Sequence, residues 1–278
     1  MLVKDNIQEI QTLMKQIKRD GKIIGIVPTM GALHDGHISL VKQAKEKCDF
    51  VFVSIFVNPT QFGEGEDFDK YPRTLQADLD KCEKAGVDLV FTPTNKIMYN
   101  EGYSTYIEAL NISQLLEGAF RPIHFRGVCT VCTKLFNISM ADYGFFGQKD
   151  YQQVAVLKKM VKELNAPIEL VMCPIIRDYD NIAMSSRNTY LSKEDRERAL
   201  WINKGLFSTK EMFDKGERNI DILRENLVNT IMKGCPEQVD YIDIYDKDTL
   251  EKTDDPTKGV MLIAAKFGTT RLIDNMMF

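Results

Sequence analysis

Two of the three histidines in this 278-residue chain, His34 and His37, lie together in the segment PTMGALHDGHISLV. The apolar run from Ile23 to Val27 precedes them and predicts a buried strand, and a helical pattern follows. A helix N-terminus offers free backbone N–H groups and the positive end of a dipole, which favour a bound phosphate. The imidazoles could contact phosphate oxygens as charge builds on a departing pyrophosphate. This spacing indicates a nucleotide site.

The same segment leaves a zinc site as the alternative, because two histidines and an aspartate are possible ligands. Its HxxH spacing straddles a glycine at a turn, unlike HExxH helices, and no third ligand cluster is evident.

Gly31 and Gly36 lack a Cβ and are expected to let a ligand approach the backbone. No GxGxxG follows the first strand and no GxxxxGK[ST] occurs, so any nucleotide would use the histidines.

Two further clusters carry cationic and hydroxyl groups. FGQKDYQQ (146–153) follows another predicted strand and opens another helix, which predicts Lys149 and Asp150 at the same sheet edge. A solvated helix N-terminus with Asp150 as an early-turn acid is the other interpretation. MSSR (184–187) offers two hydroxyls and a guanidinium that suit phosphate oxygens, although serine-rich loops with an arginine are common.

Strands and helices alternate through the first two thirds of the chain, beginning with a helix whose apolar face is Val3, Ile7, Ile10, Met14 and Ile17. Strands are predicted at 23–27, 50–57, 88–92, 142–146 and up to Ile176, and helices at 37–47, 73–85, 125–138 and 151–164. This order predicts an α/β fold with a Rossmann-like, doubly wound parallel sheet, which binds ligands at the carboxyl ends of its strands.

The pattern changes after residue 176. Two helical segments (193–214 and 217–233) precede strand-like runs at 241–245, 260–267 and 270–274. We therefore expect a Rossmann-like domain over 1–176 and a smaller C-terminal α+β domain over 177–278. The connecting stretch 177–188 is polar and rich in small residues, as a hinge or lid would be.

Composition narrows the class of protein. A net charge of -4 gives no general attraction to nucleic acid, and no apolar stretch approaches the roughly 18 residues of a membrane span. The charged N-terminus lacks the apolar core of a signal peptide. Six scattered cysteines in a chain of this size predict reduced thiols and a cytoplasmic location. Cys129 and Cys132 form a CxxC within an apolar run, which predicts buried core thiols.

Seven segments occur in a specific order along almost the entire chain. They are VPTMGALHDGH (27–37), FVNPTQF (56–62), YPRT (71–74), HFRGV (124–128), FGQKDYQQ (146–153), AMSSRN (183–188) and TRLIDN (270–275). Together they closely resemble the pantothenate synthetases, or pantoate–β-alanine ligases, a family of the HxGH nucleotidyltransferase type. The resemblance implies that pantoate attacks the α-phosphate of ATP to give pantoyl adenylate and pyrophosphate. β-Alanine then displaces AMP and forms pantothenate, a step toward coenzyme A.

The resemblance also assigns residues. The implied catalytic groups are His37, His34, Lys149 and Arg187. The implied ATP-binding residues are Met30, Gly31, Ala32, Leu33, His34, Asp35, Gly36, His37, Gly147, Gln148, Lys149, Asp150, Ile176, Met184, Ser185, Ser186 and Arg187. Gln61 and Gln153 would bind pantoate, with Gln61 also near the β-alanine amine, because an amide both donates and accepts hydrogen bonds.

The family resemblance implies Mg²⁺ with the ATP and a homodimer. The protein ligand of the metal stays unknown, with Asp78 as a candidate only. The acidic segment 63–69 (GEGEDFD) is expected to be a mobile flap. Asn181 stands where a glycine is common in the family, and asparagine tolerates positive φ better than most residues.

Two other functions remain open at this stage. A related nucleotidyltransferase would keep the same nucleotide site but retain AMP in its product. A regulatory nucleotide-binding protein would have lost catalysis, although a pure binder has no need of the four cationic or imidazole groups named above.

Overall fold

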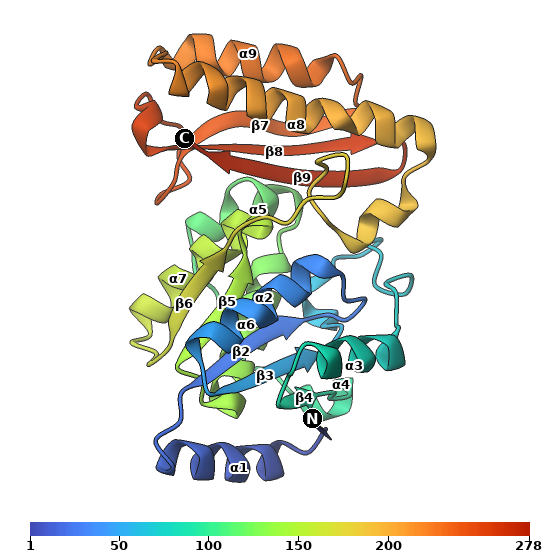
Figure 1. Cartoon of the computed structure of the whole chain (residues 1–278), viewed down its shortest axis with the longest axis vertical. Helices are drawn as coiled ribbons and strands as arrows, with labels where there is room; N and C mark the ends of the chain where they lie inside the picture. The colour runs from blue at the N-terminus through green and yellow to red at the C-terminus, as the bar shows by residue number, and fades with distance from the viewer. The chain divides into compact units, whose positions relative to one another are not determined.

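The computed structural model describes residues 1–278 and divides them into two compact units (Figure 1). The first unit comprises Met1–Gly147 and Gln152–Pro174, and the second comprises Gln148–Tyr151 and Ile175–Phe278. The short segment 148–151 therefore groups with the C-terminal unit, although the sequence pattern assigns it to the first domain. None of the helices combines the length and apolar character that crossing a bilayer requires.

The first unit is built on a six-stranded sheet in the order β1-β4-β3-β2-β5-β6, and every paired strand is parallel. Its strands are β1 (Leu2–Lys4), β2 (Ile24–Thr29), β3 (Phe50–Ile55), β4 (Leu89–Phe91), β5 (Tyr143–Gly147) and β6 (Glu169–Cys173). From β2 the chain moves outward through β3 to β4, then returns to place β5 on the other side of β2. This reversal confirms the doubly wound fold and puts the topological switch between β2 and β5.

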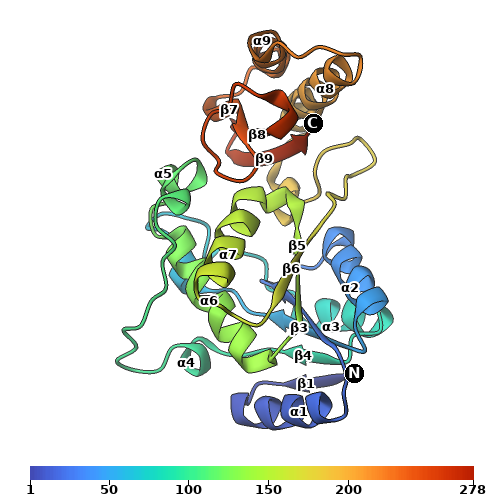
Figure 2. The ribbon, with the colours of Figure 1, turned by 90° about the vertical axis from the view of Figure 1, so that its left-hand side faces the viewer.

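Helices cover both faces of this sheet. Figure 2 shows α2 (Asp35–Lys47) and α3 (Leu75–Lys84) on one face, and α6 (His124–Ser139) and α7 (Tyr151–Glu163) on the other. The helix α1 (Ile7–Arg19) packs beside α6, and two short helices, α4 (Asn95–Met98) and α5 (Glu117–Phe120), lie in the connections. Cys129 and Cys132 are buried in α6, where burial raises the pKa of Cys129 to about 12. The expectation of buried core thiols is confirmed.

Several of the expected elements differ at their ends, and two of these differences are instructive. Val3 belongs to the short edge strand β1, which pairs with β4, and not to the following helix. A three-residue strand has too little pattern to be recognised, and only its partner reveals it. The strand expected to end at Ile176 ends at Cys173. Cys173 pairs with Gly147, the last residue of β5, so the chain beyond Cys173 has no strand residue to pair with.

The second unit is a small α+β structure, as expected. Its antiparallel sheet has the order β7-β8-β9 and is packed by the helices α8 and α9. The elements are α8 (Lys193–Asp214), α9 (Ile220–Met232), β7 (Gln238–Asp246), β8 (Gly259–Phe267) and β9 (Thr270–Met277). The helices bury Leu206, Leu223 and Leu227 against Met261 and Ile263 of the central strand, which gives this unit its own core.

Candidate active site

The chain leaves β2 through a tight loop that one buried carboxylate holds. Asp78 of α3 is 1% exposed and accepts the backbone N–H groups of Ala32 (2.9 Å) and Leu33 (2.8 Å). It also accepts the hydroxyl of Thr74 at 3.1 Å. Since Ala32 has a φ of 50°, these bonds stabilise a left-handed turn that a non-glycine residue rarely adopts.

Asp78 is therefore already bonded in the role of a structural acceptor, which argues against the metal role considered for it. A direct metal bond would compete with the donors that now occupy both of its oxygens. No group of three or more His, Cys, Asp or Glu side chains is arranged to hold a metal ion, so the zinc alternative finds no support in this structure.

His34 and His37 come together at the start of α2. Their ring centroids lie 4.1 Å apart, and Nδ1 of His37 accepts the backbone N–H of His34 at 3.2 Å. Because Nδ1 is an acceptor, the neutral ring of His37 carries its proton on Nε2. The structure thus gives His37 a fixed tautomer with a donor on the opposite side of the ring.

The two glycines of the loop are explained by protein contacts. A Cβ on Gly31 would lie 3.1 Å from an oxygen of Asp78, and Gly31 also has a φ of 83°. A Cβ on Gly36 would lie 2.9 Å from the ring of His34. The absent side chains make room for Asp78 and His34, and the approach of a ligand to this backbone stays a prediction.

Gln61, expected to bind pantoate, has a buried and fully oriented amide. It is 7% exposed, its Oε1 accepts from Asn58 Nδ2 at 3.0 Å, and its Nε2 approaches the sulfur of Met30 at 3.1 Å. Asn58 is itself fixed by the hydroxyl of Tyr99 at 2.7 Å. The structure thus brings together Met30 and Gln61, which were predicted for different ligands.

The backbone carbonyl of Gln61 is held from the other side by residues that the sequence analysis did not assign. His124 Nδ1 lies 2.9 Å from this oxygen, and Arg121 Nη2 lies 3.5 Å away. His124 is 8% exposed, and burial, with the nearby Arg121 charge, lowers its pKa to about 4. Neutral His124 therefore donates through Nδ1. The motif HFRGV was the only signal for it in the sequence.

Gly127 of the same motif lets α6 approach the Gln61 turn. A Cβ at this position would lie 2.3 Å from the carbonyl oxygen of Thr60 and 2.5 Å from the nitrogen of Gln61. Any side chain would push the turn away from the helix. The requirement for glycine here comes from a close backbone approach.

The acidic segment 63–69 contacts the rest of the first unit through a salt bridge and an aromatic pair. Glu66 forms a bidentate ion pair with Arg121, at 3.0 and 2.6 Å, and Phe68 contacts Phe62 edge-on with ring centroids 5.4 Å apart. Burial alone would raise the pKa of Glu66, but the hydrogen bonds and charge of Arg121 outweigh it and hold this pKa below its usual range. The expected mobility of this segment remains a prediction.

The two glutamines at the start of α7 have different environments. Gln152 is 4% exposed and donates to the carbonyls of Ile112 and Leu115, while it accepts from the backbone N–H of Glu117. Gln153, the one expected to bind pantoate, is half-buried. Gln152 is thus a structural residue, and Gln153 keeps accessible surface.

A cavity of about 420 Å³ opens in the first unit at the carboxyl ends of β2, β3 and β4. Met30 and Gly31 line it from the β2 loop, and Arg73 and Asp78 line it from the other side. Its position agrees with the rule that ligands of parallel sheets bind beyond the carboxyl ends of the strands.

Of the predicted ATP residues, those at 30–37 and Gly147 at the end of β5 belong to the first unit, and the others belong to the second. Lys149 and Asp150 lie in the short 3₁₀ turn Gln148–Asp150, with Nζ of Lys149 3.7 Å from Oδ1 of Asp150. Ser185 caps the 3₁₀ helix Ser186–Tyr190 by accepting the N–H of Arg187. This unit therefore fixes Ser185 and Arg187 in one turn.

The loop before that turn doubles back on itself. The N–H of Met184 donates to the carbonyl of Ile176 at 3.0 Å, and Arg177 pairs with Ala183 in an antiparallel bridge. Asn181 lies at the tip with a φ of 70°, so this asparagine adopts the positive φ that asparagine tolerates better than most residues.

A doubly wound parallel sheet with polar side chains gathered beyond β2 places the chain in the Rossmann-like class of α/β proteins. Comparison with known proteins makes this class specific. The family model of pantoate–β-alanine ligases matches residues 2–277. A pantothenate synthetase of Acetivibrio thermocellus is 49% identical over 278 residues, which cover 99% of both chains.

Solved structures agree with the sequence comparison. A pantothenate synthetase of Thermus thermophilus superposes with a TM-score of 0.93 at 38% identity, covering 99% of both chains. A pantoate–β-alanine ligase of Francisella tularensis, described as complexed with β-γ ATP and β-alanine, gives a TM-score of 0.79 at 35% identity. It covers all of this chain and 97% of its own. The chain belongs to the pantoate–β-alanine ligase family, and it is a ligase.

We expect Asp78→Asn to disturb the loop after β2. The N–H groups of Ala32 and Leu33 donate to different oxygens of Asp78, and an amide nitrogen in place of one oxygen leaves one of them without an acceptor. The free energy of unfolding should therefore fall by about 1–3 kcal/mol. Chemical denaturation measures this loss. Asp80→Asn is the matched control. Asp80 lies on the same helix, and its carboxylate accepts a hydrogen bond from Gln76 of that helix. Equal stability of the two variants would contradict the anchoring role.

His124 should make stability depend on pH. Its pKa is about 4 in the folded protein and near 6.5 when unfolded, so the unfolded chain binds more protons between these values. The contribution of neutral His124 to the free energy of unfolding is fully present above pH 6.5. As the pH falls from 6.5 toward 4, this contribution decreases by roughly 3 kcal/mol.

His124→Asn supplies the test, because an asparagine amide can still donate to the Gln61 carbonyl but does not titrate. The difference in unfolding free energy between wild type and variant should shift in favour of the variant between pH 7 and pH 4. A difference that stays constant over this range would show that His124 is not held neutral in the folded protein.

Proposed function

We propose that this protein uses ATP to condense pantoate with β-alanine, by way of pantoyl adenylate, and releases AMP and pyrophosphate. The observation that carries the proposal is the start of α2, where the chain leaves the switch-point strand β2 into an oriented pair of histidines. The name of the family to which the chain belongs states the ligation of pantoate with β-alanine, and the match over residues 2–277 supports these two substrates here.

The residues proposed to bind ATP are those that the family resemblance assigns. In the first unit these are residues 30–37 and Gly147. In the second unit they are Gln148, Lys149, Asp150, Ile176, Met184, Ser185, Ser186 and Arg187. Phosphates are anions, and both the helix start at residue 34 and the cations Lys149 and Arg187 supply the complementary charge. His37 and His34 complete the proposed catalytic set.

In the first step a carboxylate oxygen of pantoate attacks the α-phosphorus of ATP, and the bond from this phosphorus to the bridging oxygen breaks. The electron pair leaves with pyrophosphate, so negative charge grows on that oxygen. Nε2–H of His37 is the donor that this tautomer provides, and Lys149 and Arg187 would neutralise the rest. Each well-placed donor contributes roughly 3 kcal/mol in such transition states.

In the second step the amine of β-alanine attacks the carbonyl carbon of the mixed anhydride. The carbon–oxygen bond to AMP breaks, AMP leaves with the electron pair, and the amine loses a proton. Gln61 and Gln153 are proposed to hold pantoate. Because Oε1 of Gln61 accepts from Asn58, the amide orientation is set before the substrate arrives, which reduces the entropy lost on binding.

Mg²⁺ is proposed to accompany ATP, where it would offset phosphate charge. The donor set fits an ion held mainly by phosphate oxygens and water, because no cluster of three acidic or imidazole side chains exists and Asp78 is already bonded. We also propose a cytoplasmic location, which the free cysteine thiols and the need for ATP support. A homodimer is proposed from family membership, and a monomer in light scattering at micromolar concentration would contradict it.

The direct test measures AMP and pyrophosphate release from ATP with pantoate, with and without β-alanine. Sustained AMP release should require β-alanine, and pantothenate should accumulate in equal amount. AMP retained in a product would support the nucleotidyltransferase alternative, and no turnover with any acid would support the regulatory one.

The role of His37 is tested in the same assay. His37→Ala should lower the rate of adenylate formation by about 10²–10³, since it removes the donor from the departing oxygen. His37→Gln should recover part of this loss, because its amide can donate from a similar position. Lys42→Ala is the control on the exposed face of the same helix. A His37→Ala variant that retains the wild-type rate would limit His37 to a structural role.

A further inference from the structure

The motif TRLIDN at 270–275 has no role in the chemistry described above, although its last two residues are almost completely buried. Asp274 is 4% exposed and Asn275 is 2% exposed, and they are neighbours on β9. Buried polar side chains usually have a defined bonding role, because leaving them unpaired costs free energy. Each of these two side chains bonds a different segment of the second unit.

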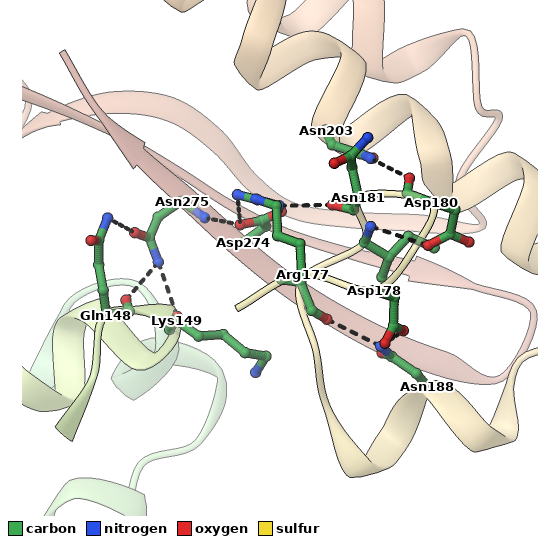
Figure 3. Close-up of polar contacts among 12 residues, drawn as sticks. Gln148, Lys149, Arg177, Asp178, Asp180, Asn181, Asn188, Asn203, Asp274 and Asn275 are labelled. Atoms are coloured by element: carbon green, nitrogen blue, oxygen red, sulfur yellow. Dashed lines mark hydrogen bonds and ion pairs between the residues drawn. The ribbon is translucent and has the colours of Figure 1, made fainter. Parts of the chain in front are cut away.

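Asn275 bonds the segment that carries Lys149. Its Nδ2 donates to the carbonyl oxygens of Gln148 (2.9 Å) and Lys149 (3.0 Å), and its Oδ1 accepts from Nε2 of Gln148 at 3.1 Å (Figure 3). Both donors and one acceptor site of the amide are therefore used on two consecutive residues. This arrangement fixes the backbone from which the Lys149 side chain extends.

Asp274 bonds the other segment. Its two carboxylate oxygens accept from the two terminal nitrogens of Arg177, at 2.7 and 3.0 Å, in a bidentate ion pair (Figure 3). The same guanidinium donates to the carbonyl of Asn181 at the loop tip, 3.0 Å away. Asp274 therefore holds the base and, through Arg177, the tip of the loop that precedes Ser185 and Arg187.

The rest of this loop is attached to α8 and to itself. Arg196 of α8 pairs with both Asp178 and Asp180, at 2.8 and 2.7 Å. Asn188 donates to Asp178 at 3.2 Å and to the carbonyl of Ala183 at 3.1 Å. The stretch 177–188 is thus held at several points within the second unit, and Figure 3 shows the bonds of Arg177, Asn181 and Asn188.

We propose that Asp274 and Asn275 are positioning residues that set the spacing between the Lys149 segment and the loop bearing Ser185, Ser186 and Arg187. This inference rests on the proposed function, in which those segments bind ATP. The side chains of adjacent strand residues point to opposite sides, so one point on β9 can reach two segments. β9 is paired along its length with β8, which makes it a rigid spacer. Neither residue has to touch ATP.

The consequence is a pre-organised set of cations. The ammonium of Lys149 and the guanidinium of Arg187 would be held at a constant separation before ATP arrives. Misplacement of such a group by about 1 Å can cost on the order of 10²-fold in rate. A buried pair at Asp274 and Arg177 also resists exchange with water, so the spacing is maintained.

The first experiment compares Asn275→Ala with Asn226→Ala as control. Asn226 also bonds two partners within this unit, Ser208 and Thr209, but lies far along the chain from either segment. We would measure ATP binding by calorimetry and pantoate-dependent pyrophosphate exchange, with circular dichroism as the check of folding. Asn275→Ala should weaken ATP binding or slow exchange by about 10- to 100-fold, and Asn226→Ala should stay within about twofold of wild type.

A second pair of variants keeps the test decisive if Asn275→Ala does not fold. Asn275→Asp preserves size but removes both donated hydrogen bonds, and Arg177→Lys keeps the charge but cannot form the bidentate pair. Each should show the same loss. Because the spacing needs both attachments, the double variant should lose little more than the worse single variant, whereas independent roles would multiply the losses.

The outcomes separate this inference from the proposed function. Wild type that binds ATP without exchanging pyrophosphate would overturn the proposed function, and the binding measurements would still test the spacing. Variants that are folded and match wild type in both ATP binding and exchange would overturn the positioning role. Equal losses in Asn275→Ala and Asn226→Ala would also overturn it, because they would indicate a general loss of stability.

Discussion

The position of the loop between β2 and α2 in the first unit depends on the carboxylate of Asp78. β2 is buried in the middle of a parallel sheet, and the chain that leaves it has no neighbouring strand to accept its N–H groups. Buried backbone donors must be paired, and Asp78 accepts two of them. The loop can then turn through a left-handed residue and enter α2 with His34 and His37 at its first turn. Without that acceptor the helix start would have no fixed position.

The same solution recurs wherever irregular backbone carries a functional side chain. The carbonyl of Gln61 is held by neutral His124, the carbonyls at 148 and 149 by Asn275, and the loop after Ile176 by Arg177 and its carboxylate. In each case a buried polar side chain from a regular helix or strand bonds a loop. Such bonds contribute modestly to stability but restrict the loop to one conformation, which a binding site requires. Rigid elements thus impose their geometry on the loops.

Prediction from the sequence succeeded where the structural signal is local. Long apolar runs predicted the strands from β2 to β5, and the change of pattern after residue 176 predicted the small antiparallel unit. The three-residue strand β1 was missed because its signal lies in its pairing with β4. Motifs singled out His34 and Gln61, whose binding roles stay predictions, and they gave no sign of the contacts that hold these residues in place. The structure adds contacts that residue types did not suggest: Gly36 accommodates the ring of His34, and Asp78 holds a loop.

The sequence by itself determined the order of elements, the family and the residues that could do chemistry, because periodicity, composition and motifs are local properties of the chain. The tertiary structure alone decided which buried groups bond each other across long separations. Asp78 lies 46 residues from Ala32, and Asn275 lies 126 residues from Lys149. A hydrogen bond depends on distance and direction in space, and neither is a function of position along the chain. The supporting residues of this site therefore became recognisable only in the folded protein.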